Sequence, residues 1–76
     1  MAVEVLSPSD SASEVIEKID QWLEAGTRLV WVVDPKKKTM TVCAPKRQPM
    51  VLRMKDTVDG EDVLPGFRLG VEEIFR

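Results

Sequence analysis

Leu29 to Val33 (LVWVV) form the longest uninterrupted apolar run in the chain, and this run limits the possible folds more than any other feature. It shows no alternation of apolar and polar residues, which is typical of a strand covered on both faces. Asp34-Pro35 follows directly and ends the strand. Such a strand needs a neighbour at each edge and a layer of side chains on each face. We therefore predict a sheet with Leu29 to Val33 in its interior.

The segment before this run predicts a strand followed by a helix. Ala2 to Leu6 (AVEVL) are apolar apart from one acid, and Ser7-Pro8-Ser9 breaks the run. Ser11 and Glu14 have the spacing of a helix-capping box. Apolar residues then recur at a helical period as far as Gly26, namely Val15, Ile16, Ile19, Trp22 and Leu23. A helix therefore joins the first strand to the central one.

The remaining residues predict further short strands. Thr39 to Cys43 (TMTVC) alternate strictly, which indicates an antiparallel partner for the central strand. Met50 to Met54 favour another short strand, and Val71 to Phe75 favour a terminal helix. We predict an α/β fold with a mixed sheet in the order strand, helix, strand, strand, strand, plus a short C-terminal helix. Because one full helix cannot cover such a sheet on both faces, the sheet is predicted to be incomplete.

The residue inventory excludes several kinds of active site. With no His and one Cys in 76 residues, the chain holds no Ser-His-Asp triad, Cys-His pair, tetrahedral zinc site or internal disulfide. Eleven Lys and Arg against 13 Asp and Glu give a net charge of -2, so any contact with nucleic acid must be local. The lone Cys43, the absence of a long apolar segment and the absence of a signal peptide predict a cytoplasmic protein with no membrane partner.

Glu4 and Lys18 are the candidates for chemistry. Glu4 stands in the middle of an apolar strand, where a buried carboxylate needs a metal ion, a lysine or a backbone donor. The alternative is an edge strand with Glu4 facing water. Lys18 flanks the apolar stripe of the helix, from which its amine can reach the strand and act on water or phosphate. The alternative for Lys18 is an ion pair with Glu14, one turn earlier.

Basic and aromatic residues elsewhere give weaker signals. Lys36 to Lys38, together with Lys46 and Arg47, could place two basic turns on one side of the molecule, where they would bind DNA or an acidic partner. The alternative is that these turns are simply solvated. Trp22 and Trp31 lie within apolar patterns and are predicted to be core residues rather than a platform for stacking bases.

Three segments, with Lys18 between the first two, resemble one family of proteins. They are VEVLSPSD (Val3 to Asp10), AGTRLVWVVDP (Ala25 to Pro35) and DTVDGEDVLPGF (Asp56 to Phe67). In this order and spacing they are similar to the C-terminal part of the bacterial restriction endonucleases of the Uma type, in the PD-(D/E)XK nuclease superfamily. The resemblance covers essentially all 76 residues. It implies a DNA endonuclease that hydrolyses phosphodiester bonds with Mg²⁺ or Mn²⁺.

The resemblance also implies roles for single residues. The family's strand glutamate before the SPS turn binds the metal, and by position this residue is Glu4. Leu6 stands where the superfamily usually has its lysine, and in this branch a helix lysine takes that role, which points to Lys18. The family's helix aromatic, usually a tyrosine, corresponds to Trp22.

The resemblance further implies that residues 1 to 76 form a single domain, the C-terminal portion of an endonuclease fold without its N-terminal half. That half supplies the second metal-binding carboxylate in the family. We therefore expect weak metal binding, weak DNA binding and little or no activity from the chain alone. One alternative function is a non-catalytic remnant that associates with itself through an exposed sheet edge as a homo-oligomer. The other is a binding module that uses the basic turns.

Overall fold

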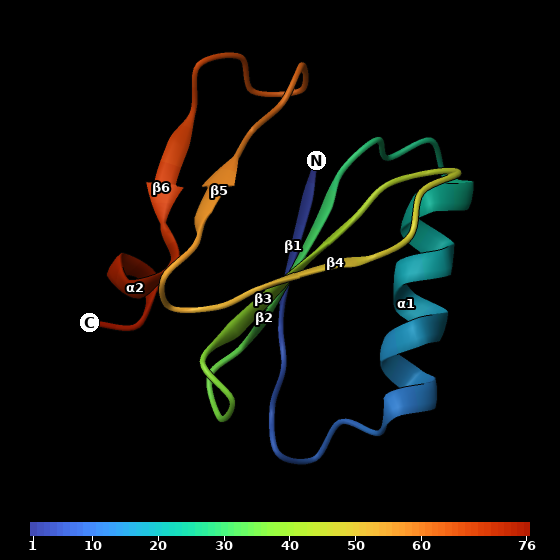
Figure 1. Ribbon diagram of the computed structural model, residues 1–76. Coiled ribbons are helices and arrows are strands. Elements are labelled where there is room, and N and C mark those ends of the chain that lie inside the picture. Colours follow the sequence, from blue (N-terminus) through green and yellow to red (C-terminus); the bar gives the residue numbers. More distant parts are fainter.

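The computed structural model describes all 76 residues, as a mixed sheet with one helix on one face and a hairpin on the other (Figure 1). The elements are β1 (Ala2–Val5), α1 (Ala12–Glu24), β2 (Val30–Asp34), β3 (Thr39–Cys43), β4 (Met50–Leu52), β5 (Thr57–Asp59), β6 (Arg68–Gly70) and α2 (Val71–Ile74). The main sheet has the order β1-β2-β3-β4, with β1 parallel to β2 and the other pairs antiparallel. The predicted mixed α/β fold with a short C-terminal helix is therefore confirmed.

Both ends of α1 are fixed by capping contacts that the sequence predicts. At the start, Ser11 Oγ accepts the backbone N–H of Glu14 at 3.2 Å and donates its own proton to Glu14 Oε1 at 2.7 Å. At the end, Gly26 adopts a left-handed φ of 95°, which lets the N–H of Thr27 donate to the carbonyl of Trp22 at 3.0 Å. The helix is thus held to the length that spans the sheet, although none of its residues is fully buried. No helix in the structure is long and apolar enough to cross a membrane.

β2 contributes side chains to two separate cores, one on each face of the sheet. The core under α1 contains Ala2, Val30, Val32 and Cys43, with Val15, Ile19 and Leu23 of the helix packed against it. The core on the other face contains Leu29, Trp31, Val33, Met40, Val42 and Val58. The predicted central strand, covered on both faces, is confirmed. Cys43 is buried, and this burial raises the pKa of its thiol above the ordinary value.

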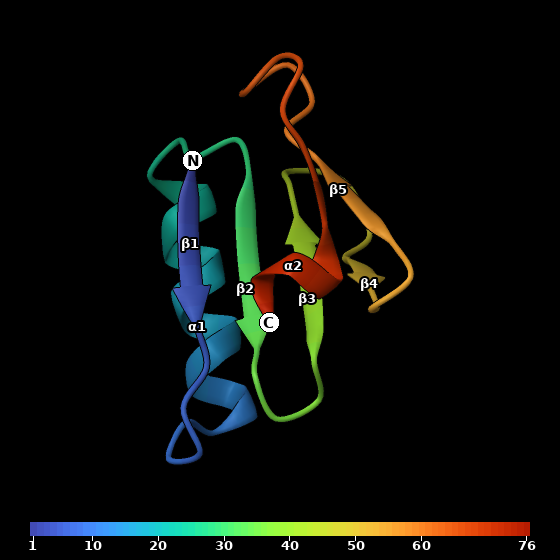
Figure 2. The ribbon, with the colours of Figure 1, turned by 90° about the vertical axis from the view of Figure 1, so that its left-hand side faces the viewer.

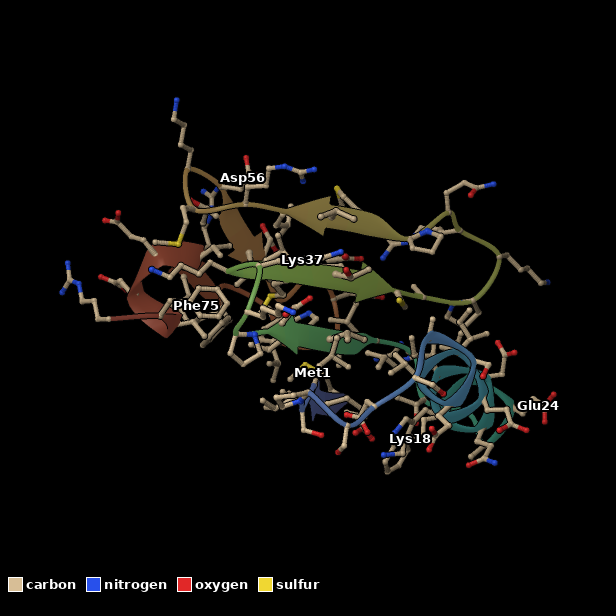
Figure 3. The ribbon with its side chains drawn as sticks, turned by 90° about the horizontal axis from the view of Figure 1, so that it is seen from below. Met1, Lys18, Glu24, Lys37, Asp56 and Phe75 are labelled. Carbon is tan, nitrogen blue, oxygen red and sulfur yellow. The ribbon has the colours of Figure 1, made fainter.

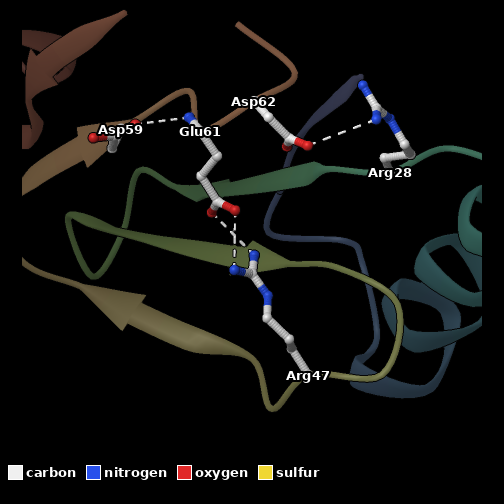
Figure 4. Close-up of polar contacts among 5 residues, drawn as sticks. All are labelled: Arg28, Arg47, Asp59, Glu61 and Asp62. Carbon is white, nitrogen blue, oxygen red and sulfur yellow. Dashed lines mark hydrogen bonds and ion pairs between the residues drawn. The ribbon is translucent and has the colours of Figure 1, made fainter. Parts of the chain in front are cut away.

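The hairpin of β5 and β6 covers the second face, and sequence reasoning did not find it (Figure 2). Its anchor is Val58, whose side chain is fully buried against the sheet. Its loop is attached by Arg47, which donates two hydrogen bonds of 3.0 Å to the two carboxylate oxygens of Glu61 (Figure 4). These hydrogen bonds raise the pKa of the Arg47 guanidinium. A looser ion pair joins Arg28 to Asp62 at 3.8 Å.

The basic turns do not lie on one side, so this part of the sequence prediction is wrong. Lys36 to Lys38 lie in the turn that joins β2 to β3, whereas Lys46 and Arg47 lie in the connection from β3 to β4. Because β3 runs the length of the sheet between these two connections, they lie at opposite ends (Figure 1). Arg47 also forms an ion pair with Glu61.

Gly60→Ala is expected to destabilise the hairpin loop. A Cβ atom at position 60 would lie 2.5 Å from the carbonyl oxygen of Leu64 and 2.6 Å from Leu64 Cβ. Because backbone must move to relieve this overlap, we expect a loss of about 1–3 kcal/mol in the free energy of unfolding, measured with urea. Gly70→Ala is the matched control, since a Cβ there meets nothing within 4 Å. Equal losses in the two variants would contradict the close approach of Leu64 to Gly60.

Candidate functional site

Glu4 lies on the edge strand β1, on the face of the sheet that α1 covers. It pairs with Val32 in the parallel register and alternates with Val3 and Val5, which face the other side. Its side chain is half-buried, and its Oε1 accepts a hydrogen bond of 2.7 Å from Trp22 Nε1. β1 is therefore an edge strand, as in the alternative prediction in which Glu4 faces water. The carboxylate nevertheless turns toward the helix, where it contacts Trp22.

The structure brings Glu4 and Lys18 to the same hollow. This hollow has a volume of about 310 Å³ and is lined by Glu4, Lys18, Gln21, Trp22 and Ala25. Figure 3 shows Lys18 on the part of α1 nearest the β1 edge. The alternative ion pair with Glu14 is not formed, because the amine of Lys18 has no carboxylate oxygen within 4 Å. Glu14 Oε1 instead accepts a hydrogen bond from Ser11 Oγ. The amine of Lys18 thus forms no ion pair within the chain.

Trp22 has a polar role that its place in the apolar stripe did not predict. The residue was expected in the core, yet it is 42% exposed and its indole N–H donates a hydrogen bond to Glu4. Trp31 is buried as expected, and its ring lies 5.7 Å from that of Phe67. The missed signal was the spacing, since Trp22 follows Lys18 by one helical turn and so shares its side of the helix.

Glu4 is the one acidic residue that lines this hollow, and no group of three or more His, Cys, Asp or Glu residues in the chain is placed to hold a metal ion. Carboxylate oxygens are the ligands that Mg²⁺ and Mn²⁺ prefer. Glu4 Oε1 accepts from Trp22, and no hydrogen bond within the chain uses Oε2. Glu4 therefore fits as one ligand of such an ion, while the 76 residues do not provide a complete set.

The turn that follows β1 carries a second carboxylate close to Lys18. The backbone N–H of Ser7 donates to Asp10 Oδ2 at 2.9 Å. This hydrogen bond, with a smaller contribution from the positive charge of Lys18, holds the pKa of Asp10 below its ordinary value. The charge of Lys18 therefore acts on the turn as well as on the hollow.

Lys18→Met is expected to raise the pKa of Asp10, because it removes the positive charge that stabilises the ionised carboxyl while leaving the Ser7 hydrogen bond in place. The measurement is a carboxyl ¹³C NMR titration of both proteins. Lys55→Met is the control, since Lys55 lies after β4 and does not act on Asp10. An unchanged Asp10 titration in Lys18→Met would show that the lysine side chain points elsewhere in solution.

Comparison with known proteins places the chain in a family. Residues 1–72 match the family Uma2, which is described as "Putative restriction endonuclease". The chain belongs to this family. The match confirms the family that the three sequence segments predicted.

A solved structure from Anabaena variabilis, "a putative nuclease belonging to DUF820", is similar to the chain, with a TM-score of 0.85 and 27% sequence identity. The alignment covers 96% of this chain and 41% of that protein, so the chain spans about two fifths of the nuclease's length. No curated protein matches the chain. The mixed sheet of this Uma2 chain is therefore a nuclease fold.

Proposed function

We propose that this chain supplies part of the active site of a metal-dependent DNA endonuclease. The observation that carries the proposal is the hydrogen bond from Trp22 to Glu4, which fixes a half-buried carboxylate at the wall of a hollow shared with Lys18. Membership of the Uma2 family and the likeness to a nuclease structure support the same reaction class. Metal-dependent hydrolysis of a phosphodiester bond uses these two kinds of group, an anionic ligand for a divalent cation and a positive charge near the phosphate.

Each residue has a distinct part in this proposal. Glu4 would hold the cation, and Trp22 acts as a positioning residue by donating a hydrogen bond to Glu4 Oε1. Mg²⁺ or Mn²⁺, when bound, lowers the pKa of a water molecule and polarises a phosphoryl oxygen. Lys18 places a positive charge in the same hollow, where it stabilises the negative charge that develops on the phosphate.

A single carboxylate makes a weak site for a divalent cation, because Mg²⁺ sheds its water reluctantly. Further oxygen ligands must come from outside the 76 residues, and the nuclease that the chain resembles is more than twice as long. We therefore propose that Glu4 and Lys18 provide one wall of the site and that the isolated chain binds the cation weakly and cleaves slowly.

Paramagnetic NMR tests the placement of the cation without depending on cleavage. Substoichiometric Mn²⁺ is expected to broaden the side-chain signals of Glu4, Trp22 and Lys18 first, because relaxation by Mn²⁺ falls steeply with distance. Plasmid nicking in Mn²⁺, and its loss in EDTA, then tests the chemistry. Uniform broadening over all carboxylates, or nicking that persists in EDTA, would contradict the proposed metal site.

A second candidate function is self-association through β1. Ala2 donates its backbone N–H to the carbonyl of Leu29, just before β2, at 3.0 Å, and Leu6 donates to the carbonyl of Val33 at 2.8 Å. The backbone groups of Val3 and Val5 therefore point away from the sheet. Both valine side chains are more than half exposed. An open apolar edge of this kind is a template for a further strand, and we propose a second copy of the chain as its partner.

Val3→Lys is expected to weaken this association, because a charge on an edge strand opposes pairing. Sedimentation equilibrium over a range of concentrations measures the effect, with a dimer expected for the unchanged chain. Val51→Lys on β4, the other edge of the sheet, is the control and should leave the dimer intact. A strictly monomeric chain would remove the proposal, and dissociation by Val51→Lys alone would move the interface to β4.

A further inference from the structure

A second hollow, remote from Glu4, gathers four cationic side chains. It has a volume of about 690 Å³, and its lining includes Lys37, Lys38, Arg53 and Lys55 together with Thr39 and Asp56. None of these residues lines the hollow of Glu4 and Lys18, and Figure 3 shows Lys37 and Asp56 well away from Lys18. We propose that this basic hollow binds closely spaced phosphate groups of one chain, as they occur in a nucleic-acid backbone or a free polyphosphate.

The topology of the sheet explains why these residues meet. β3 and β4 are antiparallel, and Met40 near the start of β3 pairs with Leu52 at the end of β4. The residues just before β3 and just after β4 therefore leave the sheet at the same end. Lys37 and Lys38 belong to the first group, and Arg53 and Lys55 belong to the second.

The four cations have no acidic partner. The three ion pairs of the structure use Arg28, Arg47 and Arg68 instead. The one carboxylate in the basic hollow, Asp56, is held by the backbone N–H of Arg53, which donates to its Oδ2 at 2.7 Å. Like charges close together repel each other, and a bound anion relieves that repulsion. Because the whole chain has a net charge of -2, this local excess is not a consequence of a basic composition.

The turn that carries two of the lysines is held by hydrogen bonds to Asp34. Asp34 Oδ1 accepts the backbone N–H groups of Lys36 and Lys37 at 3.0 and 3.1 Å. Lys38 has a φ of 54°, in the left-handed region that side-chain-bearing residues rarely adopt. Glycine or asparagine would relieve this strain, yet the position holds a lysine. The backbone that carries Lys37 and Lys38 is thus held by contacts within the turn.

The chemistry of the lining defines the ligand. Lysine acts on phosphate as a point charge, and arginine binds two oxygens of one phosphate through its planar guanidinium. Four such groups around about 690 Å³ exceed what one phosphate can contact. A ligand with successive phosphates can contact all four cationic side chains. If the chain is part of a nuclease, as proposed above, the DNA backbone supplies such phosphates. The site itself does not depend on the proposed hydrolysis, because tripolyphosphate carries the same groups.

The test compares the double variant Lys37→Ala and Arg53→Ala with the control Lys46→Ala, which lies at the opposite end of the sheet. Fluorescence anisotropy with a labelled single-stranded 20-mer and titration with tripolyphosphate, both in EDTA, measure affinity while metal-dependent cleavage is blocked. We expect the double variant to weaken binding of these probes by at least about tenfold at low salt and to lower the DNA salt slope by about 1.4, the value for two lost phosphate contacts. Lys46→Ala should change neither.

Loss of DNA binding alone in the double variant would identify nucleic acid as the source of the phosphates, and loss of tripolyphosphate binding alone would identify a free polyphosphate. Shifts of the Lys38 and Lys55 amide signals with either probe provide a check on the unchanged chain. The proposal is overturned if neither probe binds, or if the double variant and Lys46→Ala lose affinity equally. Tripolyphosphate binding in EDTA involves neither metal nor cleavage, so failure of the nuclease proposal and failure of this one give different results.

Discussion

Glu4→Gln is expected to reduce the slow Mn²⁺-dependent nicking of supercoiled plasmid to background. Mutation of a residue that only supports a metal ligand already lowers metal affinity or activity about 10- to 100-fold, and loss of a direct ligand should lower them further. Glutamine keeps the length of the side chain and an oxygen that can accept the hydrogen bond from Trp22 Nε1. What it loses is the negative charge that attracts a divalent cation. The substitution therefore separates the charge of Glu4 from its structural contact.

The matched control for this experiment is Glu73→Gln. It makes the same change of charge on the exposed surface of α2, and α2 packs on the face of the sheet opposite α1. Nicking and Mn²⁺ broadening of the Trp22 signals should both persist in the control and disappear in Glu4→Gln. Wild-type activity in Glu4→Gln would show that the carboxylate is not a ligand, and the proposed mechanism would fall with it.

The elements that the sequence predicted well are those with strong local signals. Leu29 to Val33 contain no polar residue, and β2 is buried on both faces accordingly. Ser11 begins the helix and Gly26 ends it, each through contacts with residues nearby in the sequence. Such signals need no knowledge of the rest of the fold, because the interacting groups are neighbours in sequence.

The elements that were missed depend on distant contacts. β5 and β6 have three residues each, too few for a period to show, and β5 has one apolar residue, Val58. Their hairpin is attached through Arg47 and Glu61, which are fourteen residues apart. The basic hollow likewise joins segments on either side of the β3–β4 pair, and only the register of that pair brings them together.

The candidate site lies between these two cases. Their positions in the strand and the helix made Glu4 and Lys18 candidates, the resemblance to the Uma-type family implied their roles, and the structure places both in one hollow. Periodicity alone could not decide whether Glu4 meets water, because in a short edge strand either set of alternating residues can face the helix. Ala2 and Glu4 turn out to share that face, which leaves Val3 exposed on the other.

Val58→Ala is expected to lower the free energy of unfolding by about 2–3 kcal/mol, from the buried methyl groups removed and the cavity left behind. The Val58 side chain has no exposed surface and is the hairpin's contribution to the core that includes Trp31 and Met40. A folded chain of 76 residues has a total stability of only about 4–11 kcal/mol. Urea unfolding measures the loss, and hydrogen exchange of the β5 and β6 amides should accelerate more than that of β2, because the hairpin loses its anchor.

Val51→Ala isolates the effect of burial, since it removes the same atoms from a strand residue that is 47% exposed. We expect a loss below about 1 kcal/mol there, because most of the benefit of burying the side chain is absent in the folded chain. If the hairpin were only loosely attached to the sheet, Val58→Ala would cost no more than this control. A large difference between the two variants would therefore establish that β5 and β6 are part of the folded core, anchored by a buried residue that no local pattern in the sequence distinguishes.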